Sequence, residues 1–202
     1  MGDGAHRGYA AGSLPRGRGQ RQLARWWRQW EQSKTRELPL IGEVHRRLAA
    51  KVPAQDRVAI VHGDYRLDNL VLSPAGEVRA VLDWELCTLG DPLADVGLLL
   101  VYWNEPGEGG GPLGEAPTAL AGFPSRAELA GRYAERSGRD LAQLDYYMAF
   151  GYWKLAAILE GVYTRFLAGA YGASPDERWR RLGDSVLALA DLALQAVERA
   201  GR

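Results

Sequence analysis

The stretch that decides the fold is residues 61–85, which read VHGDYRLDNLVLSPAGEVRAVLDWE. Apolar runs separated by polar turns predict three short strands, at 58–61, 70–72 and 78–82. The letters SPAG at 73–76 are a turn signal, so we expect 70–83 to form a β-hairpin. Polar residues thus follow the first and third strands, at strand ends where loops meet and functional sites form.

Those polar residues have ligand and acid–base chemistry. His62, Gly63 and Asp64 come first, Asn69 closes the same loop, and Asp83 follows the hairpin. Clustered carboxylates repel one another unless a cation joins them, and Mg²⁺ takes one or two carboxylates together with water and phosphate oxygens. The phosphoryl-transfer template of protein kinases, H-R-D-x-x-x-x-N and then D-F-G, has the same parts in the same order. The pattern predicts a phosphoryl-transfer site; the alternative is a chance set of turn residues, because Asp and Asn favour turns.

Three segments of the chain resemble the aminoglycoside phosphotransferase family, and most of all its branch fused to, or encoded near, acyl-CoA dehydrogenases. They are VHGDYRLDN at 61–69, VLDWE at 81–85 and GDPLAD at 90–95. WEQSKTRELP at 30–39 and WKLAAILEG at 153–161 agree, so the resemblance covers about 21–199. It implies a two-lobed protein-kinase-like fold and transfer of the γ-phosphate of ATP to a small-molecule hydroxyl. For this branch it implies hydroxyacyl acceptors, CoA-linked ones among them, more than antibiotics.

The resemblance also implies roles for the residues of the motifs. Asp64 is the implied catalytic base, and Asn69 and Asp83 are the implied Mg²⁺ ligands through which ATP is held. The implied support comes from His62, which braces the loop, and from Asp91 or Asp95, either of which can brace the loop backbone from a helix N-terminus.

Three basic residues are candidates for binding an anionic substrate. Arg66 lies inside the catalytic loop and could meet a phosphate, although a solvated arginine is the alternative. Lys154 and Arg165 lie on a long aromatic helix of the kind that walls the acceptor pocket in the family. The alternative is that both are surface cations at the edge of the helix, whose aliphatic chains cover apolar surface while the charged ends reach water.

The remaining chain is expected to be mainly helical, which makes the fold class α+β: the large C-terminal lobe of a kinase-like protein with a small β-hairpin. Helical periodicity begins at 21, a second helix begins at Pro39, and others are expected at 92–103, from Ser125, at 146–167, and from Ser174 to about 199. We expect 104–122 to be a loop, because it is rich in Gly and Pro without periodicity.

This organisation gives a disordered Gly/Arg-rich arm at 1–20 and a kinase-like lobe at 21–202, with the catalytic loop at 62–69, the metal motif at 83–85 and a helical subdomain at 92–199. Only about 60 residues precede His62, and they contain neither a phosphate-covering loop between strands nor a lysine on a strand. We therefore expect the nucleotide-binding N-terminal lobe to be missing. The alternative to an enzyme is then a non-catalytic remnant, or a split subunit whose partner chain supplies that lobe.

Composition excludes several other classes of protein. One cysteine excludes a disulfide framework, and we interpret Cys87 as a small core residue. No apolar run could span a bilayer and no export signal begins the chain, so a cytoplasmic protein without a membrane partner is expected. Residues 1–51 hold 11 Lys and Arg against 4 Asp and Glu, a basic head that suits nucleic acid. No nucleic-acid motif accompanies that head, so we expect no nucleic-acid partner.

Overall fold

The structure is a computed structural model, and it describes residues 17–54, 58–108, 111–114, 116–170 and 177–201. Its helices are α1 (Arg18–Ser33), α2 (Pro39–Ala50), α3 (Leu93–Tyr102), α4 (Arg126–Ser137), α5 (Leu144–Leu167) and α6 (Glu177–Arg199). Its strands are β1 (Ala59–Val61), β2 (Leu70–Leu72), β3 (Val78–Val81) and β4 (Thr88–Gly90). Single 3₁₀ turns stand at η1 (Leu67–Asn69), η2 (Trp84–Leu86) and η3 (Pro117–Ala119). The expected mainly helical chain with a small hairpin is confirmed.

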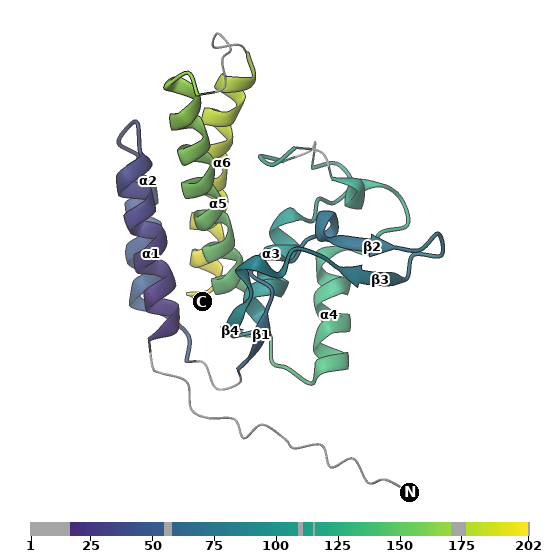
Figure 1. The fold of residues 1–202 in the computed structure, drawn as a ribbon. Helices are drawn as coiled ribbons and strands as arrows, with labels where there is room; N and C mark the ends of the chain where they lie inside the picture. The colour runs from purple at the N-terminus through teal and green to yellow at the C-terminus, as the bar shows by residue number, and fades with distance from the viewer. Residues whose placement is uncertain (1–16, 55–57, 109–110, 115, 171–176, 202) are drawn as a thin grey trace, which may run out of the picture.

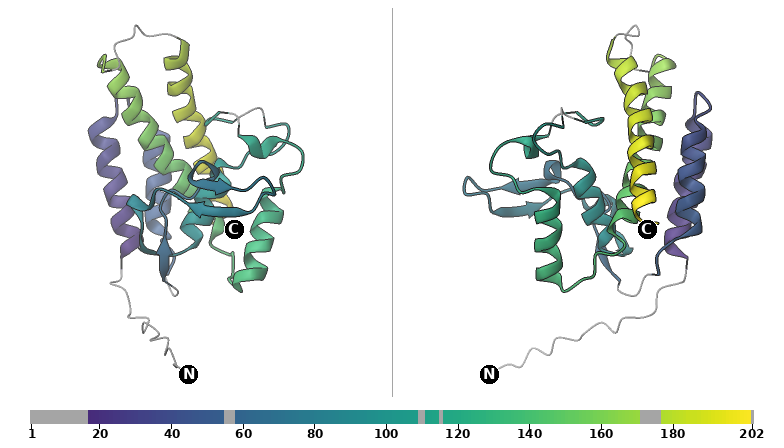
Figure 2. Two further views of the ribbon diagram at one scale, coloured as in Figure 1. Left: turned by 45° about the vertical axis from the view of Figure 1, so that its right-hand side comes forward. Right: turned by 180° about the vertical axis from the view of Figure 1, so that it is seen from behind.

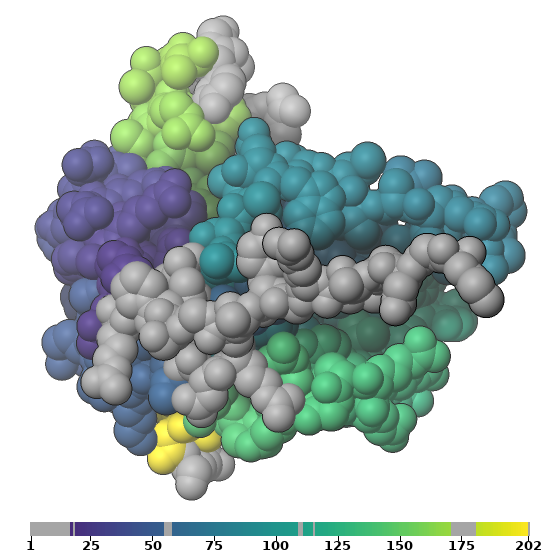
Figure 3. Space-filling view, turned by 60° about the horizontal axis from the view of Figure 1, so that its bottom comes forward, coloured from purple at the N-terminus to yellow at the C-terminus, as the bar shows by residue number. Residues whose placement is uncertain are grey.

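Four helices form a bundle along one side of the molecule. Helices α1 and α2 lie beside α5 and α6, and α5 packs on α6, α1, α2 and α3 (Figures 1 and 2). The β2–β3 hairpin projects on the opposite side, above α4, and Figure 3 shows these two elements facing away from α1 and α2. The β1–β4 pair lies between the bundle and α4 (Figure 1).

The core sits where α5 meets its neighbours. Trp153 of α5 is fully buried, and its Nε1–H donates to the carbonyl of Ile41 at 3.0 Å. The His45 ring stacks between the rings of Trp27 and Trp153, with centroid separations of 4.4 and 5.4 Å. Helix α3 comes close to α5 at Gly97, where a Cβ would lie 2.9 Å from the backbone of Tyr147. Any larger residue at position 97 would push α3 off α5, and α3 carries Asp95, which binds the main chain of His62 and Gly63.

A buried carboxylate ties the α1–α2 connection to α5. Glu160 is fully buried, and its Oε1 accepts hydrogen bonds from the main-chain N–H of Thr35 at 3.0 Å and from the Thr35 hydroxyl at 2.7 Å. Its Oε2 lies 3.7 Å from Nη2 of Arg36. A buried charge is costly unless it has partners, and Thr35 and Arg36 supply partners for Glu160. The glutamate can therefore be accommodated inside the bundle.

The strands form two antiparallel pairs. The expected hairpin is β2 paired with β3, with Leu70 opposite Val81. The first strand, β1, pairs with β4, a strand that the sequence did not predict. Ile60, at the centre of β1, is 68% exposed, so the expectation of a buried run at 58–61 is wrong: a two-stranded pair at the surface covers only one face of the strand.

Other boundaries differ in detail from the expectations. Helix α1 begins at Arg18, three residues before the expected start at 21, and α5 begins at Leu144. Ser125 caps α4 in a reciprocal capping box with Glu128, as the sequence predicted. The predicted cap Ser174 and the arm at 1–16 lie outside the described residues. Cys87 is exposed beside η2, so its interpretation as a core residue is wrong.

None of the helices in the described ranges combines the length and the apolar character needed to cross a membrane.

Candidate active site

The catalytic loop is held in shape by Asn69. The side-chain Nδ2 of Asn69 donates to the Asp64 carbonyl at 2.7 Å and to Asp64 Oδ2 at 3.1 Å. The loop therefore closes on itself between the two residues that the H-G-D-x-x-x-x-N spacing singled out. Because the amide nitrogen makes these bonds, the amide oxygen Oδ1 is the atom of the Asn69 side chain that could act as a metal ligand.

His62 joins the start of this loop to the end of β3. It is buried, and its Nε2 lies 2.7 Å from the Leu82 carbonyl, so Nε2 carries the proton and donates. Its Nδ1 then accepts the main-chain N–H of Asp64 at 3.3 Å. The ring thus ties Asp64 to the residue before Asp83.

Asp95, in the first turn of α3, holds the main chain of the same loop. Its two carboxylate oxygens accept the main-chain N–H groups of His62 and Gly63, at 2.6 and 2.8 Å. Asp91, the other acid that the sequence offered for this task, instead accepts the N–H of Leu93 at the start of α3. A single carboxylate therefore fixes the two residues that lead into Asp64.

Asp83 stands in a backbone conformation that few residues adopt. Its φ and ψ are 61° and 58°, and it is the one residue other than glycine with a positive φ among those the structure describes. Such conformations cost free energy and collect at functional sites, and Asp tolerates them better than most residues. The carboxylate of Asp83 is exposed and has no hydrogen bond or ion pair within the described part of the chain.

Asp83 and Asn69 lie next to each other because of the hairpin register. The N–H of Leu82 donates to the Asn69 carbonyl at 2.8 Å, one step beyond the pairing of Leu70 with Val81. The residues that precede β2 and follow β3 are thereby placed at the same end of the hairpin.

The side chains at this end of the hairpin fit a Mg²⁺ ion that also binds water and phosphate oxygens. They do not fit a metal ion whose ligands all come from the protein. Within the described residues, no three His, Cys, Asp or Glu side chains are grouped so that they could hold a metal ion. The available ligands are the Asp83 carboxylate and the Asn69 amide oxygen. Mg²⁺ suits this pair, because it usually takes one or two carboxylates and fills its shell with water and phosphate oxygens.

Arg66 lies near Asp64 but is engaged elsewhere. Its guanidinium pairs with Asp68 at 2.7 Å, lies 4.0 Å from Asp64 Oδ2, and stacks 4.7 Å over the ring of Tyr102. Burial raises the pKa of the Tyr102 hydroxyl, and the neighbouring Arg66 partly offsets that rise. The alternative of a solvated arginine is therefore wrong: Arg66 is held by Asp68 and Tyr102, with Asp64 at a longer distance.

The two substrate candidates on α5 are in different places. Nζ of Lys154 donates to the Gly63 carbonyl at 3.1 Å, directly beside the catalytic loop. Burial is the main reason that the pKa of Lys154 is lowered, and the carboxylates of Asp64 and Asp95 oppose that shift. Arg165 lies three helical turns further along α5, about 16 Å away, in a hollow between α1 and α5. The structure thus brings Lys154 to the site and leaves Arg165 outside it.

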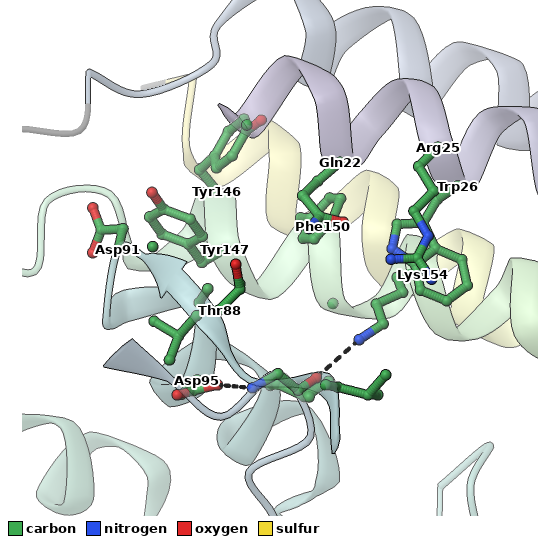
Figure 4. A pocket seen from close by; sticks show the side chains of 18 of the residues that line it. Gln22, Arg25, Trp26, Thr88, Asp91, Asp95, Tyr146, Tyr147, Phe150 and Lys154 are labelled. Carbon is green, nitrogen blue, oxygen red and sulfur yellow. Dashed lines mark hydrogen bonds between the residues drawn. The ribbon is translucent and has the colours of Figure 1, made fainter. Parts of the chain in front are cut away.

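A pocket of about 170 Å³ opens beside Gly63 between α1, α5 and the β1–β4 pair. Figure 4 shows Lys154 reaching across it towards the loop, with Arg25 and Trp26 of α1 next to it. Most of the other lining side chains are apolar, among them Leu86, Leu89, Leu98 and Phe150. No local pattern marks Arg25 or Trp26 as lining residues, because both lie far from the catalytic loop along the chain.

Replacing Asp95 with Asn is expected to loosen the loop. An amide offers one oxygen to two N–H donors, so one main-chain bond is lost and the unfolding free energy falls by about 2 kcal/mol. Chemical denaturation measures the loss. Asp91→Asn is the matched control, since its amide oxygen still accepts the Leu93 N–H, and a loss as large in Asp91→Asn as in Asp95→Asn would contradict the assignment.

Known proteins place the chain in a family. The model described as the phosphotransferase enzyme family, APH, matches residues 2–147. Acyl-CoA dehydrogenase family member 10 of Mus musculus is 36% identical over 174 residues, which are 84% of this chain and 16% of that protein. Acyl-CoA dehydrogenase family member 11 of Homo sapiens is 34% identical over 80% of this chain and 21% of its own length. The chain therefore spans less than a quarter of these relatives.

A solved structure from Ralstonia eutropha, provisionally named an aminoglycoside phosphotransferase, has the same fold with a TM-score of 0.70 and 32% identity. The match covers 91% of this chain and 55% of that one. The expected kinase-like fold class is thereby confirmed. Because the family model covers well over half of the chain and the loop at 62–69 has the geometry described above, the chain belongs to the aminoglycoside phosphotransferase (APH) family of phosphotransferases.

Proposed function

We propose that the chain transfers the γ-phosphate of ATP, with Mg²⁺, to the hydroxyl of a small molecule. The observation that carries the proposal is the double use of Asn69: its amide nitrogen fixes Asp64, and its main chain pairs with Leu82 beside Asp83. A proton acceptor and a pair of metal-ligand oxygens are thereby held in one rigid unit. Family membership supports phosphotransfer as the reaction type.

Asp64 acts as the proton acceptor in this proposal. Its Oδ2 is bound by the Asn69 amide, which leaves Oδ1 to take the proton of the acceptor hydroxyl as the new P–O bond forms, while the bond from the γ-phosphorus to the bridging oxygen breaks and ADP leaves. Asn69 and Asp83 would hold Mg²⁺, which supplies charge neutralisation on the phosphate oxygens when it is bound. His62 and Asp95 keep these groups in place by holding the main chain of the loop.

The proposed acceptor is a hydroxyacyl compound, CoA-linked ones included. Two observations support this choice: the relatives are named acyl-CoA dehydrogenase family members, and the pocket beside Gly63 is lined mainly by apolar side chains. An aminoglycoside, a polar polycation, fits such a lining poorly.

The test is transfer of γ-labelled phosphate from Mg·ATP to an acceptor, followed by ³¹P NMR. A short hydroxyacyl-CoA, the matching acyl-CoA without the hydroxyl and an aminoglycoside are compared. A phosphate ester is expected with the first alone. A product formed only from the aminoglycoside would overturn the proposed acceptor class. If neither the hydroxyacyl-CoA nor the aminoglycoside gave a product, phosphotransfer by this chain alone would be overturned.

A second candidate is a subunit that works only with a partner supplying the nucleotide-binding lobe. The observation in its favour is a set of exposed apolar side chains at the hairpin, namely Val71, Leu72, Val78 and Leu82, which are 42–53% exposed. Under this reading, the transfer assay gives product only after the separately produced nucleotide-binding lobe of a relative is added.

A further inference from the structure

The pocket beside Gly63 has a concentrated positive charge at one end. The Lys154 ammonium lies 5.3 Å from the centroid of the Trp26 ring, and the Arg25 guanidinium lies 5.6 Å from the same ring. Two cations thus flank one indole. Figure 4 shows these three residues together, while Asp91, Tyr146 and Tyr147 lie at the other end of the pocket.

Among the described residues, no Asp or Glu lies within ion-pair distance of Lys154 or Arg25, whereas Arg36, Arg66 and Arg126 each lie within that distance of a carboxylate. The two acids that line the pocket are already engaged with main-chain N–H groups: Asp95 with His62 and Gly63, and Asp91 with Leu93. The carboxylates of Asp64 and Asp95 act on Lys154 only from beyond ion-pair distance, so neither Lys154 nor Arg25 is in direct contact with a carboxylate of the described residues.

The ammonium also has hydrogen-bonding capacity to spare. A lysine ammonium has three N–H donors, and Lys154 uses one of them on the Gly63 carbonyl. Burial lowers the pKa of Lys154, so keeping the side chain charged at this position costs free energy. A ligand oxyanion would take the remaining donors and recover that cost, since charge-assisted hydrogen bonds are about twice as strong as neutral ones.

We infer that Lys154 and Arg25 form an oxyanion-recognition pair, so that the pocket accepts a molecule with an apolar body and a carboxylate or phosphate group at its Arg25–Lys154 end. This inference rests on the proposed function, because it names the chemistry of the acceptor. Lys154 touches the ligand oxyanion and the Gly63 carbonyl at once, and so places the bound molecule beside the loop that carries Asp64. A polycationic acceptor is repelled by the same pair.

Binding of three ligands with the same chain length tests the inference without any turnover. Octanoate and octyl phosphate carry an oxyanion, and 1-octanol is the neutral comparison. The ¹H–¹⁵N signal of the Trp26 indole, assigned with Trp26→Phe, reports binding in this pocket. Both anions are expected to bind at least about tenfold more tightly than octanol, because one charge-assisted hydrogen bond contributes about that much. If only octyl phosphate is favoured, the group recognised is a phosphate; if both are, a carboxylate suffices.

Variants separate charge recognition from packing. Lys154→Met keeps the length of the side chain and removes the charge, so the preference for octanoate over octanol is expected to disappear, while Lys154→Arg restores it. Lys51→Met, which removes an exposed cation at the end of α2, is the matched control and keeps the wild-type preference. Arg25→Gln, on the exposed face of α1, reduces the preference and serves as the second variant if Lys154→Met does not fold.

The outcomes distinguish this inference from the proposed function. Equal binding of octanol and octanoate by the wild type, or a preference that survives in Lys154→Met, overturns oxyanion recognition even if phosphotransfer is observed. A Lys154-dependent preference in a chain that transfers no phosphate supports the recognition pair and counts against the proposed function alone.

Discussion

Asp64→Asn is expected to lower kcat for phosphate transfer about a thousandfold and to leave the affinity for Mg·ATP unchanged. An amide cannot accept the hydroxyl proton, whereas the Asn69 side chain that orients position 64 can still bond to the amide oxygen and to the main-chain carbonyl. The loss is therefore confined to the chemical step. Steady-state kinetics with the acceptor identified in the transfer assay, together with calorimetric titration of Mg·ATP, measure the two quantities separately.

The matched control is Glu77→Gln, which removes a carboxylate from the exposed turn of the hairpin, where it pairs with Arg79. Its kcat should equal that of the wild type. If Asp64→Asn kept a tenth or more of the wild-type kcat, Asp64 would not be the base.

Trp153→Ala is expected to reduce the free energy of unfolding by about 4 kcal/mol. The indole is fully buried where α2 meets α5, stacks on His45 and donates to the Ile41 carbonyl, so truncation leaves a large cavity and removes that hydrogen bond. Chemical denaturation measures the loss. Trp153→Phe refills most of the cavity without the N–H and should fall between the wild type and Trp153→Ala.

Trp84→Ala is the comparison for this prediction. Trp84 is 47% exposed, and its Nε1–H donates to the Val81 carbonyl at the surface. Its truncation should cost about 1 kcal/mol, chiefly through that hydrogen bond. Similar losses for Trp84→Ala and Trp153→Ala would contradict the placement of the core.

The local parts of this architecture could be read from the sequence. The hairpin followed from apolar runs around a turn, and the spacing from His62 to Asn69 identified the loop that the hydrogen bonds of Asn69 close. The cap of α4 followed from Ser125 and Glu128 for the same reason. Each of these interactions joins residues close together in the chain, so the residue types and their spacing are enough to predict it.

Interactions between distant segments could not be read in this way. The strand at Thr88–Gly90 is three residues long and is defined by its pairing with β1, which no local pattern shows. The sequence could not choose between Asp91 and Asp95, because both stand at the start of the same helix. The structure makes the choice: Asp91 accepts the Leu93 N–H and Asp95 accepts the two loop N–H groups. In the sequence, Arg25 is one charge of the basic head, and only the packing of α1 on α5 places it in the same pocket as Lys154.

The most direct test of the central proposal, that Asn69 and Asp83 hold a Mg·phosphate site beside Asp64, is calorimetric titration of Mg·ATP into the folded chain and into Asp83→Asn. The account predicts saturable binding by the wild type that is weakened at least about tenfold in Asp83→Asn, because a metal ligand is lost, and is retained in Glu77→Gln. Equal binding by the wild type and Asp83→Asn would contradict it. No binding by a folded wild-type chain would contradict the claim that this chain alone holds the nucleotide, and would leave the partner-dependent subunit as the remaining candidate.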